Sequence, residues 1–153
     1  MQFTLVSISR RVPGWIASGY DEYARRLPKS CRLELAERPP SRGDTPEKIR
    51  AEEAERLLEA ARRSDRVIAL DERGDMWSTR ELAALMARWG QDGEDVALLV
   101  GGAEGLDDSV RERADACWSL SRLTLPHQLV RILVAEQVYR AWSLNQNHPY
   151  HRG

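Results

Sequence analysis

Residues 119–131, with the sequence S-L-S-R-L-T-L-P-H-Q-L-V-R, decide how the rest of the chain is interpreted. Their first half alternates leucines with polar or small residues, a pattern typical of a β-strand. Pro126 ends that run and fits the first position of a helix, where the missing N–H costs nothing. The stretch therefore predicts a strand that passes into a helix, with free backbone groups at the carboxyl end of the strand, where open α/β sheets bind ligands.

A second junction of this kind lies upstream. The apolar run Val96–Val100 leads directly into Gly101-Gly102-Ala103-Glu104-Gly105. Glycine lets the backbone approach a ligand closely, but the cluster lacks the order of a dinucleotide fingerprint or of a phosphate loop. A tight turn without a ligand explains the pattern equally well. If both junctions lie at one edge of a sheet, two backbone-rich loops border a single crevice.

The rest of the chain alternates between strand-like and helix-like patterns. Strands are expected over residues 2–9, 32–38, 66–71, 95–100 and 119–125, and helices over residues 15–27, 45–63, 78–89, 107–118 and 126–145. Ser78 and Glu81 form a capping-box pattern at the start of one of these helices. The alternation predicts one α/β domain spanning residues 1–153, with a mostly parallel sheet flanked by helices.

Length and composition set the broad class of the protein. A chain of 153 residues with 42% hydrophobic and 31% charged residues is an ordinary globular sequence that can bury one core. No apolar run approaches the roughly 20 residues that a membrane span needs, and the N-terminus lacks a signal-peptide pattern. Cys31 and Cys117 have neither metal-ligand spacing nor a disulfide-rich context. We therefore expect a cytoplasmic protein without a membrane contact.

The charges are distributed unevenly along the chain. The net charge is −1, but residues 1–50 carry +4, residues 51–117 carry −8 and residues 118–153 carry +3. An acidic middle between basic ends can present a local positive surface. This asymmetry suggests an anionic partner without naming it.

A few polar residues stand out near the C-terminus. Arg131, close to the predicted crevice, either holds a phosphate or is a solvated or salt-bridged helix residue. The ending N-H-P-Y-H-R concentrates His148, Tyr150, His151 and Arg152, which combine proton carriers, a stacking ring and a phosphate-binding group. Chain ends are often frayed, so composition alone leaves the role of this tail open.

Several segments together resemble one known family. They are Leu70-Asp71, Gly101 to Leu106, residues 119–127, Arg131, Glu136, Tyr139-Arg140-Ala141 and the ending His148-Pro149-Tyr150-His151-Arg152. These segments closely resemble the RlmH family, SPOUT-class methyltransferases that act on large-subunit ribosomal RNA. The resemblance covers essentially the whole chain, and the L-T-L-P-H run and the N-H-P-Y-H-R ending are its most specific parts. Similarity is poorest over residues 39–46.

The resemblance implies both an activity and an architecture. It implies an S-adenosylmethionine-dependent enzyme that methylates N3 of a pseudouridine in the large-subunit (23S) ribosomal RNA of assembled ribosomes. It also implies a sheet with a deep trefoil knot near the C-terminus and a homodimer whose cofactor sites lie by the interface. Generic topology rules treat knots as nearly forbidden, so the chain pattern by itself predicts none.

The resemblance also implies which residues form the site. Its cofactor contacts fall on Leu70, Gly101, Gly102, Leu120, Ser121, Arg122, Leu123, Thr124 and Leu125. Candidates for the catalytic step are His148, Tyr150, His151 and Arg152, and candidates for RNA phosphate are Arg131 and Arg152. No metal is expected, because methyl transfer mostly needs positioning and removal of the N3 proton, and the sequence contains no metal-ligand cluster.

Three alternatives stay open at this point. The chain could be a SPOUT methyltransferase for another RNA, such as transfer RNA. It could also be a ribosome-binding factor that kept the fold without catalysis. A nucleotide-binding α/β module is the third, and the missing phosphate motifs disfavour it.

Overall fold

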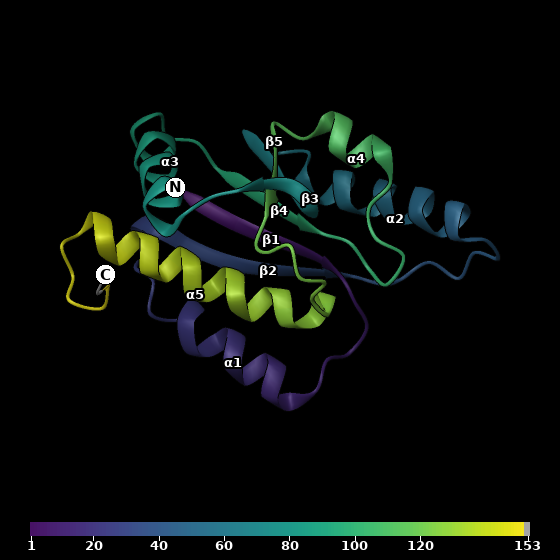
Figure 1. Cartoon of the computed structure of the whole chain (residues 1–153), viewed down its shortest axis with the longest axis horizontal. Helices are drawn as coiled ribbons and strands as arrows, with labels where there is room; N and C mark the ends of the chain where they lie inside the picture. Colours follow the sequence, from purple (N-terminus) through teal and green to yellow (C-terminus); the bar gives the residue numbers. More distant parts are fainter. Residues whose placement is uncertain (152–153) are drawn as a thin grey trace.

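Five parallel strands form a single sheet in the computed structural model, which describes residues 1–151 (Figure 1). The strands are β1 (Gln2–Ile8), β2 (Arg32–Arg38), β3 (Arg66–Met76), β4 (Val96–Val100) and β5 (Ala116–Ser119). Their order across the sheet is β2-β1-β4-β3-β5. This confirms the predicted α/β fold with a parallel sheet flanked by helices.

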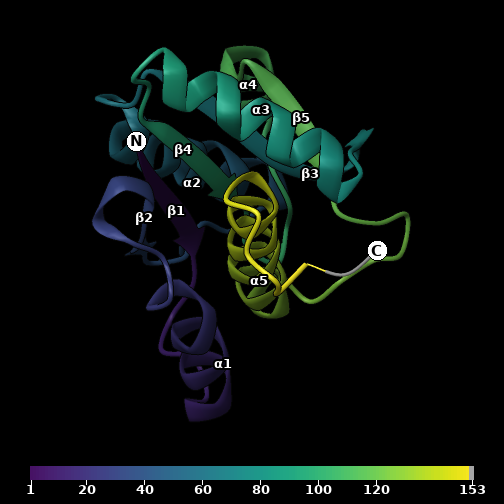
Figure 2. The ribbon, with the colours of Figure 1, turned by 90° about the vertical axis from the view of Figure 1, so that its left-hand side faces the viewer.

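Helices cover both faces of the sheet, as Figures 1 and 2 show from two directions. The helices are α1 (Gly14–Ala24), α2 (Pro46–Ala61), α3 (Thr79–Gln91), α4 (Asp108–Arg113) and α5 (His127–Asn145), with a short 3₁₀ turn, η1, at Lys29–Cys31. Helices α1, α3 and α5 lie on one face, while α2 and α4 lie on the other. The molecule therefore has three layers and two apolar cores.

The sequence separates the two cores by strand periodicity. In β1, Phe3 and Leu5 face the core under α1, α3 and α5, whereas Val6 and Ile8 face the core under α2 and α4. Strand β4 is buried along its whole length, as expected for a parallel strand covered on both faces. Each fully buried Leu, Ile or Phe contributes about 2 kcal/mol, so the sheet is held from both sides.

Helix starts follow the capping patterns of the sequence. The Ser78 hydroxyl accepts from the Glu81 N–H and the Glu81 side chain accepts from the Ser78 N–H, which confirms the predicted capping box. Thr45 caps α2 by accepting from the Lys48 N–H at 3.1 Å, with Pro46 in the first turn. These caps fix the residues at which α2 and α3 begin.

One predicted strand is wrong. Strand β5 ends at Ser119, and residues 120–126 form a loop instead of a strand that reaches Leu125. Side chains there bind the local backbone: the Ser119 hydroxyl donates to the Ser121 carbonyl, and the Leu123 N–H donates to the Ser121 hydroxyl. Such local hydrogen bonds compete with a strand ladder, and Leu123 is 72% exposed rather than packed.

Two other elements differ in length from the prediction. Helix α4 ends at Arg113 rather than near Trp118, because residues 116–119 are needed for β5. Strand β3 continues to Met76, beyond the expected end at Asp71, through an irregularity between Leu70 and Asp75. At this irregularity Gly74 lies so close to β5 that a Cβ would be 2.6 Å from the Cys117 carbonyl carbon.

Because all five strands are parallel, their carboxyl ends meet at one edge of the sheet. The segments that follow β3, β4 and β5 therefore lie next to one another there.

None of the helices within residues 1–151 is long and apolar enough to cross a membrane. The deep knot near the C-terminus remains a prediction.

Candidate functional site

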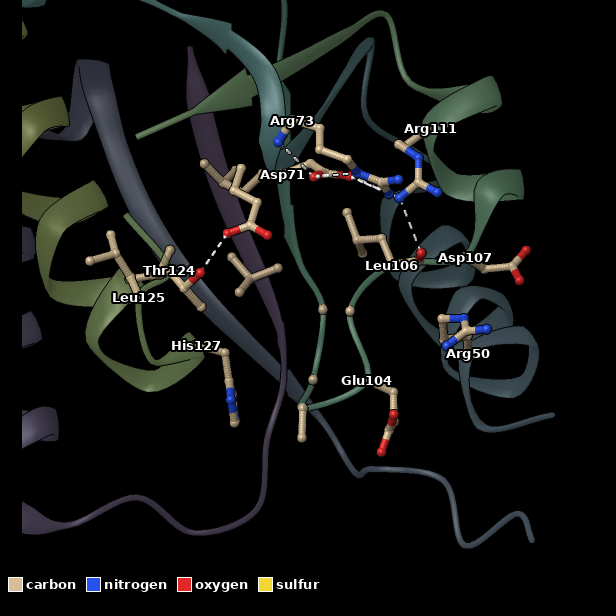
Figure 3. A pocket seen from close by; sticks show the side chains of 18 of the residues that line it. Arg50, Asp71, Arg73, Glu104, Leu106, Asp107, Arg111, Thr124, Leu125 and His127 are labelled. Atoms are coloured by element: carbon tan, nitrogen blue, oxygen red, sulfur yellow. Dashed lines mark hydrogen bonds and ion pairs between the residues drawn. The ribbon is translucent and has the colours of Figure 1, made fainter. Parts of the chain in front are cut away.

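A cavity of about 880 Å³ opens at the carboxyl ends of β3, β4 and β5 (Figure 3). Three segments line most of it: residues 70–73, residues 100–108 and the loop and first turn of α5 from Leu120 to Val130. Glu47 and Arg50 of α2 complete one side. The two junctions that the sequence singles out thus border the same cavity.

The glycine loop after β4 folds back tightly on itself. A Cβ on Gly101 would lie 2.9 Å from the Gly105 carbonyl carbon, and Gly105 has a φ of +80°. The Gly105 N–H donates to the Gly102 carbonyl at 3.0 Å. A side chain at Gly101 would therefore force the two arms of the loop apart, which explains why the chain uses glycine there.

Gly102 is constrained by a different neighbour. A Cβ there would lie 3.1 Å from Oε1 of Glu53, which is buried in α2, and 3.1 Å from Cγ2 of Ile8. The other Glu53 carboxylate oxygen accepts from the Ser41 N–H at 3.0 Å. Helix α2 and the end of β1 thus support the glycine loop from behind.

Apolar side chains form the inner wall of the cavity. Leu70, Val100, Leu106 and Trp118 line it and are at most 9% exposed. The Trp118 ring stacks on Trp77 with centroids 5.2 Å apart, which fixes the floor beside β5. A flat heterocycle of modest size fits such a wall better than a chain of phosphates.

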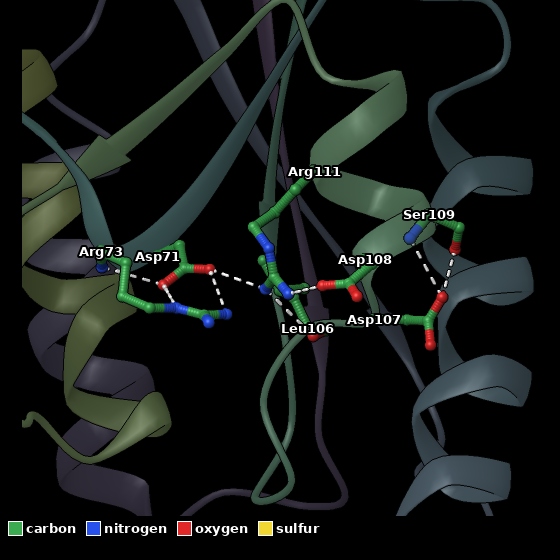
Figure 4. A network of polar contacts seen from close by, with 7 residues as sticks. All are labelled: Asp71, Arg73, Leu106, Asp107, Asp108, Ser109 and Arg111. Atoms are coloured by element: carbon green, nitrogen blue, oxygen red, sulfur yellow. Dashed lines mark hydrogen bonds and ion pairs between the residues drawn. The ribbon is translucent and has the colours of Figure 1, made fainter.

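Several lining residues form an ion-pair network, which Figure 4 shows. The Asp71 carboxylate accepts from the Arg73 N–H at 2.9 Å and from the Arg111 guanidinium at 2.8 Å. Arg111 also pairs with Asp108 and donates to the Leu106 carbonyl at 3.1 Å. Burial alone would raise the pKa of Asp71, but these hydrogen bonds outweigh burial and lower it, so Asp71 is ionised at neutral pH.

Glu47 at the cavity pairs with Arg50, but Glu72, Glu104 and Asp107 form no ion pair with any residue of the described range 1–151. Glu72 accepts from the Thr124 hydroxyl at 3.1 Å, which ties β3 to the loop before α5. Asp107 is bound by the N–H and hydroxyl of Ser109, which lower its pKa, and Glu104 is exposed in the glycine loop. The cavity therefore has a surplus of negative charge, which favours a cationic ligand.

One histidine lies inside the cavity. His127, in the first turn of α5, is half-buried, and burial together with the nearby Arg131 lowers its pKa. Its imidazole is therefore neutral at pH 7 and can accept a proton. Its place after Pro126 near a helix start is explained equally well by a structural role, so the pattern alone does not single His127 out.

Arg131 does not have the position expected of an RNA contact. Its side chain is 1% exposed, and its guanidinium donates to the Ser9 hydroxyl at 2.8 Å and to the Glu37 carboxylate at 3.3 Å. It thereby ties α5 to the ends of β1 and β2. The guanidinium is thus enclosed, with one nitrogen paired to Ser9 and Glu37 and its Nε without a hydrogen-bond partner among the described residues, and a contact of Arg131 with RNA phosphate stays a prediction.

The C-terminal tail packs along α5 rather than over the cavity. The Tyr150 hydroxyl donates to Glu136 at 2.6 Å, and its ring lies 4.7 Å from the Tyr139 ring and under the Arg140 guanidinium. Burial and then Glu136 raise the pKa of Tyr150 to about 12, so it is a neutral phenol at pH 7. His148 is exposed, and its ring nitrogen accepts from the Tyr150 N–H at 3.2 Å.

The predicted site residues thus fall into two groups. Leu70, Gly101, Gly102, Leu120, Ser121, Leu123, Thr124 and Leu125 line the cavity together. Arg122 lies on the same loop with its side chain exposed outside the lining. His148, Tyr150 and His151 are not among the lining residues, and Arg152 lies outside the described residues.

Sequence reasoning missed part of the lining. Arg111 reaches Asp71 only because α4 lies beside β3, although 40 residues separate the two in sequence. The signal that was available is Asp71 itself, a charged residue directly after a buried strand. Within residues 1–151, no group of three or more His, Cys, Asp or Glu side chains is arranged to hold a metal ion.

Comparison with known proteins identifies the class. A family model described as "Predicted SPOUT methyltransferase" matches residues 1–151, and the chain belongs to this family. Solved structures share the fold: a probable methylase family protein from Haemophilus influenzae superposes with a TM-score of 0.59 at 15% identity, covering 99% of this chain and 70% of that one. A probable methyltransferase from Bordetella pertussis gives 0.54 at 16% identity, covering 92% of this chain and 94% of that one.

Closer relatives carry a more particular name. The chain is 52% identical to the ribosomal RNA large subunit methyltransferase H of Methylococcus capsulatus, over 99% of this chain and 100% of the relative. It is 48% identical to the protein of the same name from Burkholderia multivorans, over 99% of both chains.

Proposed function

We propose that this protein transfers a methyl group from S-adenosylmethionine to N3 of a pseudouridine in large-subunit ribosomal RNA, acting on assembled ribosomes in the cytoplasm. The observation that carries the proposal is the cavity at the carboxyl ends of β3, β4 and β5, bordered by the glycine loop and the 120–127 loop. Family membership and relatives of nearly equal length support the same activity.

The cavity suits S-adenosylmethionine in shape and charge. Gly101 and Gly102 let the loop after β4 pack closely on Gly105, Glu53 and Ile8, so that its backbone lines the cavity. Leu70, Leu120 and Leu125 offer apolar walls for adenine. The donor carries a sulfonium and an ammonium, and the unpaired carboxylates of Glu72, Glu104 and Asp107 favour such positive charge. Thr124 and Ser121 add hydroxyls for polar atoms at the rim.

When bound, this cofactor supplies an electrophilic methyl group on sulfur. The protein's part is then to align the ring nitrogen with that methyl group and to accept the N3 proton. Neutral His127 lies in the cavity, while His148 and His151 lie in the tail. Tyr150 is protonated at neutral pH and serves as a hydrogen-bond donor or stacking ring, not as a base.

The separation between tail and cavity favours a homodimer as the active form. The cavity borders the first turn of α5 at His127, whereas Tyr150 contacts Glu136 and Tyr139, about 14 and 18 Å further along a helix that rises about 1.5 Å per residue. We therefore propose that the tail of one subunit completes the cavity of the other and presents the proton acceptor. This arrangement keeps the cofactor site within one chain and makes catalysis depend on two.

Labelled methyl transfer tests the proposed reaction. Purified protein with labelled S-adenosylmethionine is incubated with intact ribosomes, free large subunits and transfer RNA, and the modified nucleoside is identified by mass spectrometry. We expect label in N3-methylpseudouridine of the large-subunit RNA, with intact ribosomes preferred. Label in transfer RNA would favour another RNA substrate, and cofactor binding by calorimetry without any transfer would favour a non-catalytic factor.

A further inference from the structure

The cavity is poorly suited to hold the phosphates of an RNA substrate, so another surface must do so. Its three arginines are engaged: Arg111 pairs with Asp71 and Asp108, Arg73 pairs with Asp71, and Arg50 pairs with Glu47. The remaining carboxylates there repel phosphate. Arg131 is enclosed, as described above. The phosphates of an RNA strand that places a base in this cavity must therefore bind at the rim of the cavity.

The segment between β1 and α1 provides a cationic rim. Arg10 and Arg11 are both exposed, and neither makes an ion pair or hydrogen bond with any residue in the described part of the chain. Trp15, in the first turn of α1, is 64% exposed. Two unpaired guanidinium groups and an exposed indole within six residues match the chemistry of single-stranded RNA, whose phosphates bind arginine and whose bases stack on aromatic rings.

Three contacts place this segment beside the cavity. Strand β1 pairs with β4 with Ser7 opposite Val100, so the next residues of β1 run alongside Gly101 and Gly102. The Cβ position of Gly102 lies 3.1 Å from Ile8. The Ser9 hydroxyl accepts from Arg131, one helical turn after cavity-lining His127. Figure 3 shows the chain after β1 passing on the His127 side of the cavity.

We propose that Arg10, Arg11 and Trp15, here called the β1–α1 patch, bind the ribosomal RNA strand next to the target nucleotide. This inference rests on the proposed function and assigns its RNA contact to residues that the sequence did not single out. The buried Arg131 then acts as a positioning residue, because its bond to Ser9 holds the base of the patch against α5. A second copy of this chain is the competing occupant of the patch.

A double variant with a matched control tests the patch. Arg10→Ala/Arg11→Ala removes the two unpaired cations, while Arg62→Ala/Arg63→Ala removes two exposed neighbouring cations at the opposite edge of the sheet, after α2 and before β3. For the first variant we expect the KM for large ribosomal subunits to rise about tenfold or more, with unchanged affinity for S-adenosylmethionine. The slope of log affinity against log salt should fall by about 1.5, the loss of two phosphate contacts.

The outcomes separate this inference from the proposed function. Wild-type protein that transfers no methyl group to ribosomes overturns the proposed function itself. With an active wild type, an unchanged KM in the patch variant, or an equal loss in the Arg62→Ala/Arg63→Ala control, overturns the patch alone. Sedimentation that shows the patch variant as a monomer where wild type is a dimer also overturns it, because the patch would then contact a second copy.

Trp15 gives an independent measurement. Trp15→Ala should raise the KM for ribosomal subunits, and Trp15→Phe should restore most of the loss, because a phenyl ring still stacks on a base. A quenching of tryptophan fluorescence by a short single-stranded RNA that disappears in Trp15→Ala would support stacking. An unchanged KM in Trp15→Ala would remove Trp15 from the patch.

Discussion

The cavity and the C-terminal tail are built in opposite ways. The cavity is shaped by backbone: glycines that exclude side chains, strand ends and a loop held by its own serine hydrogen bonds. The tail consists of chemically versatile side chains, of which His148 and Tyr150 lie against α5, away from the cavity of their own chain. If the tail removes the proton, as we propose, changes in the tail should slow methyl transfer without weakening cofactor binding.

Removing the tail should have the largest effect on the rate of methyl transfer while leaving cofactor binding intact. Truncation after Asn147 removes every predicted catalytic residue, so the rate of methyl transfer should fall by about 100-fold or more, the usual contribution of a positioned acid or base. Affinity for S-adenosylmethionine, measured by calorimetry, should not change. Transfer at the parental rate would contradict a catalytic tail, and a thermal melt is needed because Tyr150 packs on Tyr139.

The second largest effect should come from a substitution in the glycine loop, which should weaken cofactor binding. Gly101→Ala places a Cβ 2.9 Å from the Gly105 carbonyl carbon, and relieving that overlap should cost about 2 kcal/mol, or about 30-fold in cofactor affinity. Gly14→Ala is the matched control, because no atom lies within 4 Å of its Cβ position. Equal affinities for both variants would show that the glycine loop does not border the cofactor.

The Asp71 network should respond to pH. Asp71→Asn leaves Arg73 and Arg111 without their carboxylate and makes the cavity less negative, so cofactor affinity should fall about tenfold. Because the pKa of Asp71 is lowered in the folded protein, its carboxylate stabilises the fold above its ordinary pKa of about 4, and this contribution is lost as pH falls.

Urea unfolding checks the sign of this dependence. The difference in free energy of unfolding between wild type and Asp71→Asn should shrink between about pH 5 and pH 3. A difference that stays constant over this range would mean that Asp71 is not stabilised by its arginine partners.

The smallest effect should come from the contact that holds the tail. Glu136→Gln removes the carboxylate that accepts from the Tyr150 hydroxyl, so the pKa of Tyr150 should fall from about 12 toward its ordinary value. Methyl transfer should slow by about twofold to fivefold, because the contact with Tyr150 is weakened and the partly exposed ion pair with Arg140 is lost. Ultraviolet titration of the phenol checks the pKa, and a truncation after Asn147 in the same background should abolish any difference in rate.

The sequence predicted the elements better than their ends. The strand periodicity of β1 and β4 and the caps at Thr45 and Ser78 are local signals, and the structure confirms them. The alternating leucines of residues 119–125 mimic a strand because a period of two does not distinguish a strand from a loop in which serine side chains bind the backbone.

In the candidate site, too, local features could be predicted from the sequence and long-range contacts could not. Gly101, Gly102 and the 120–125 loop could be found from glycine and proline placement and from the family resemblance. The burial of Arg131 could not, because it depends on Ser9 and Glu37, which lie 122 and 94 residues away in sequence. Likewise, the tail motif indicates chemistry but carries no information on which subunit's cavity it serves.

The surplus of carboxylates around the cavity has a consequence for turnover. A sulfonium donor gives up its positive charge when the methyl group leaves, so the spent thioether gains less from Glu72, Glu104 and Asp107 than the fresh donor did. These carboxylates should therefore bind the sulfonium donor more tightly than the thioether product, which favours release of the product. Dissociation constants of the two compounds, compared at low and high salt, should converge as screening increases.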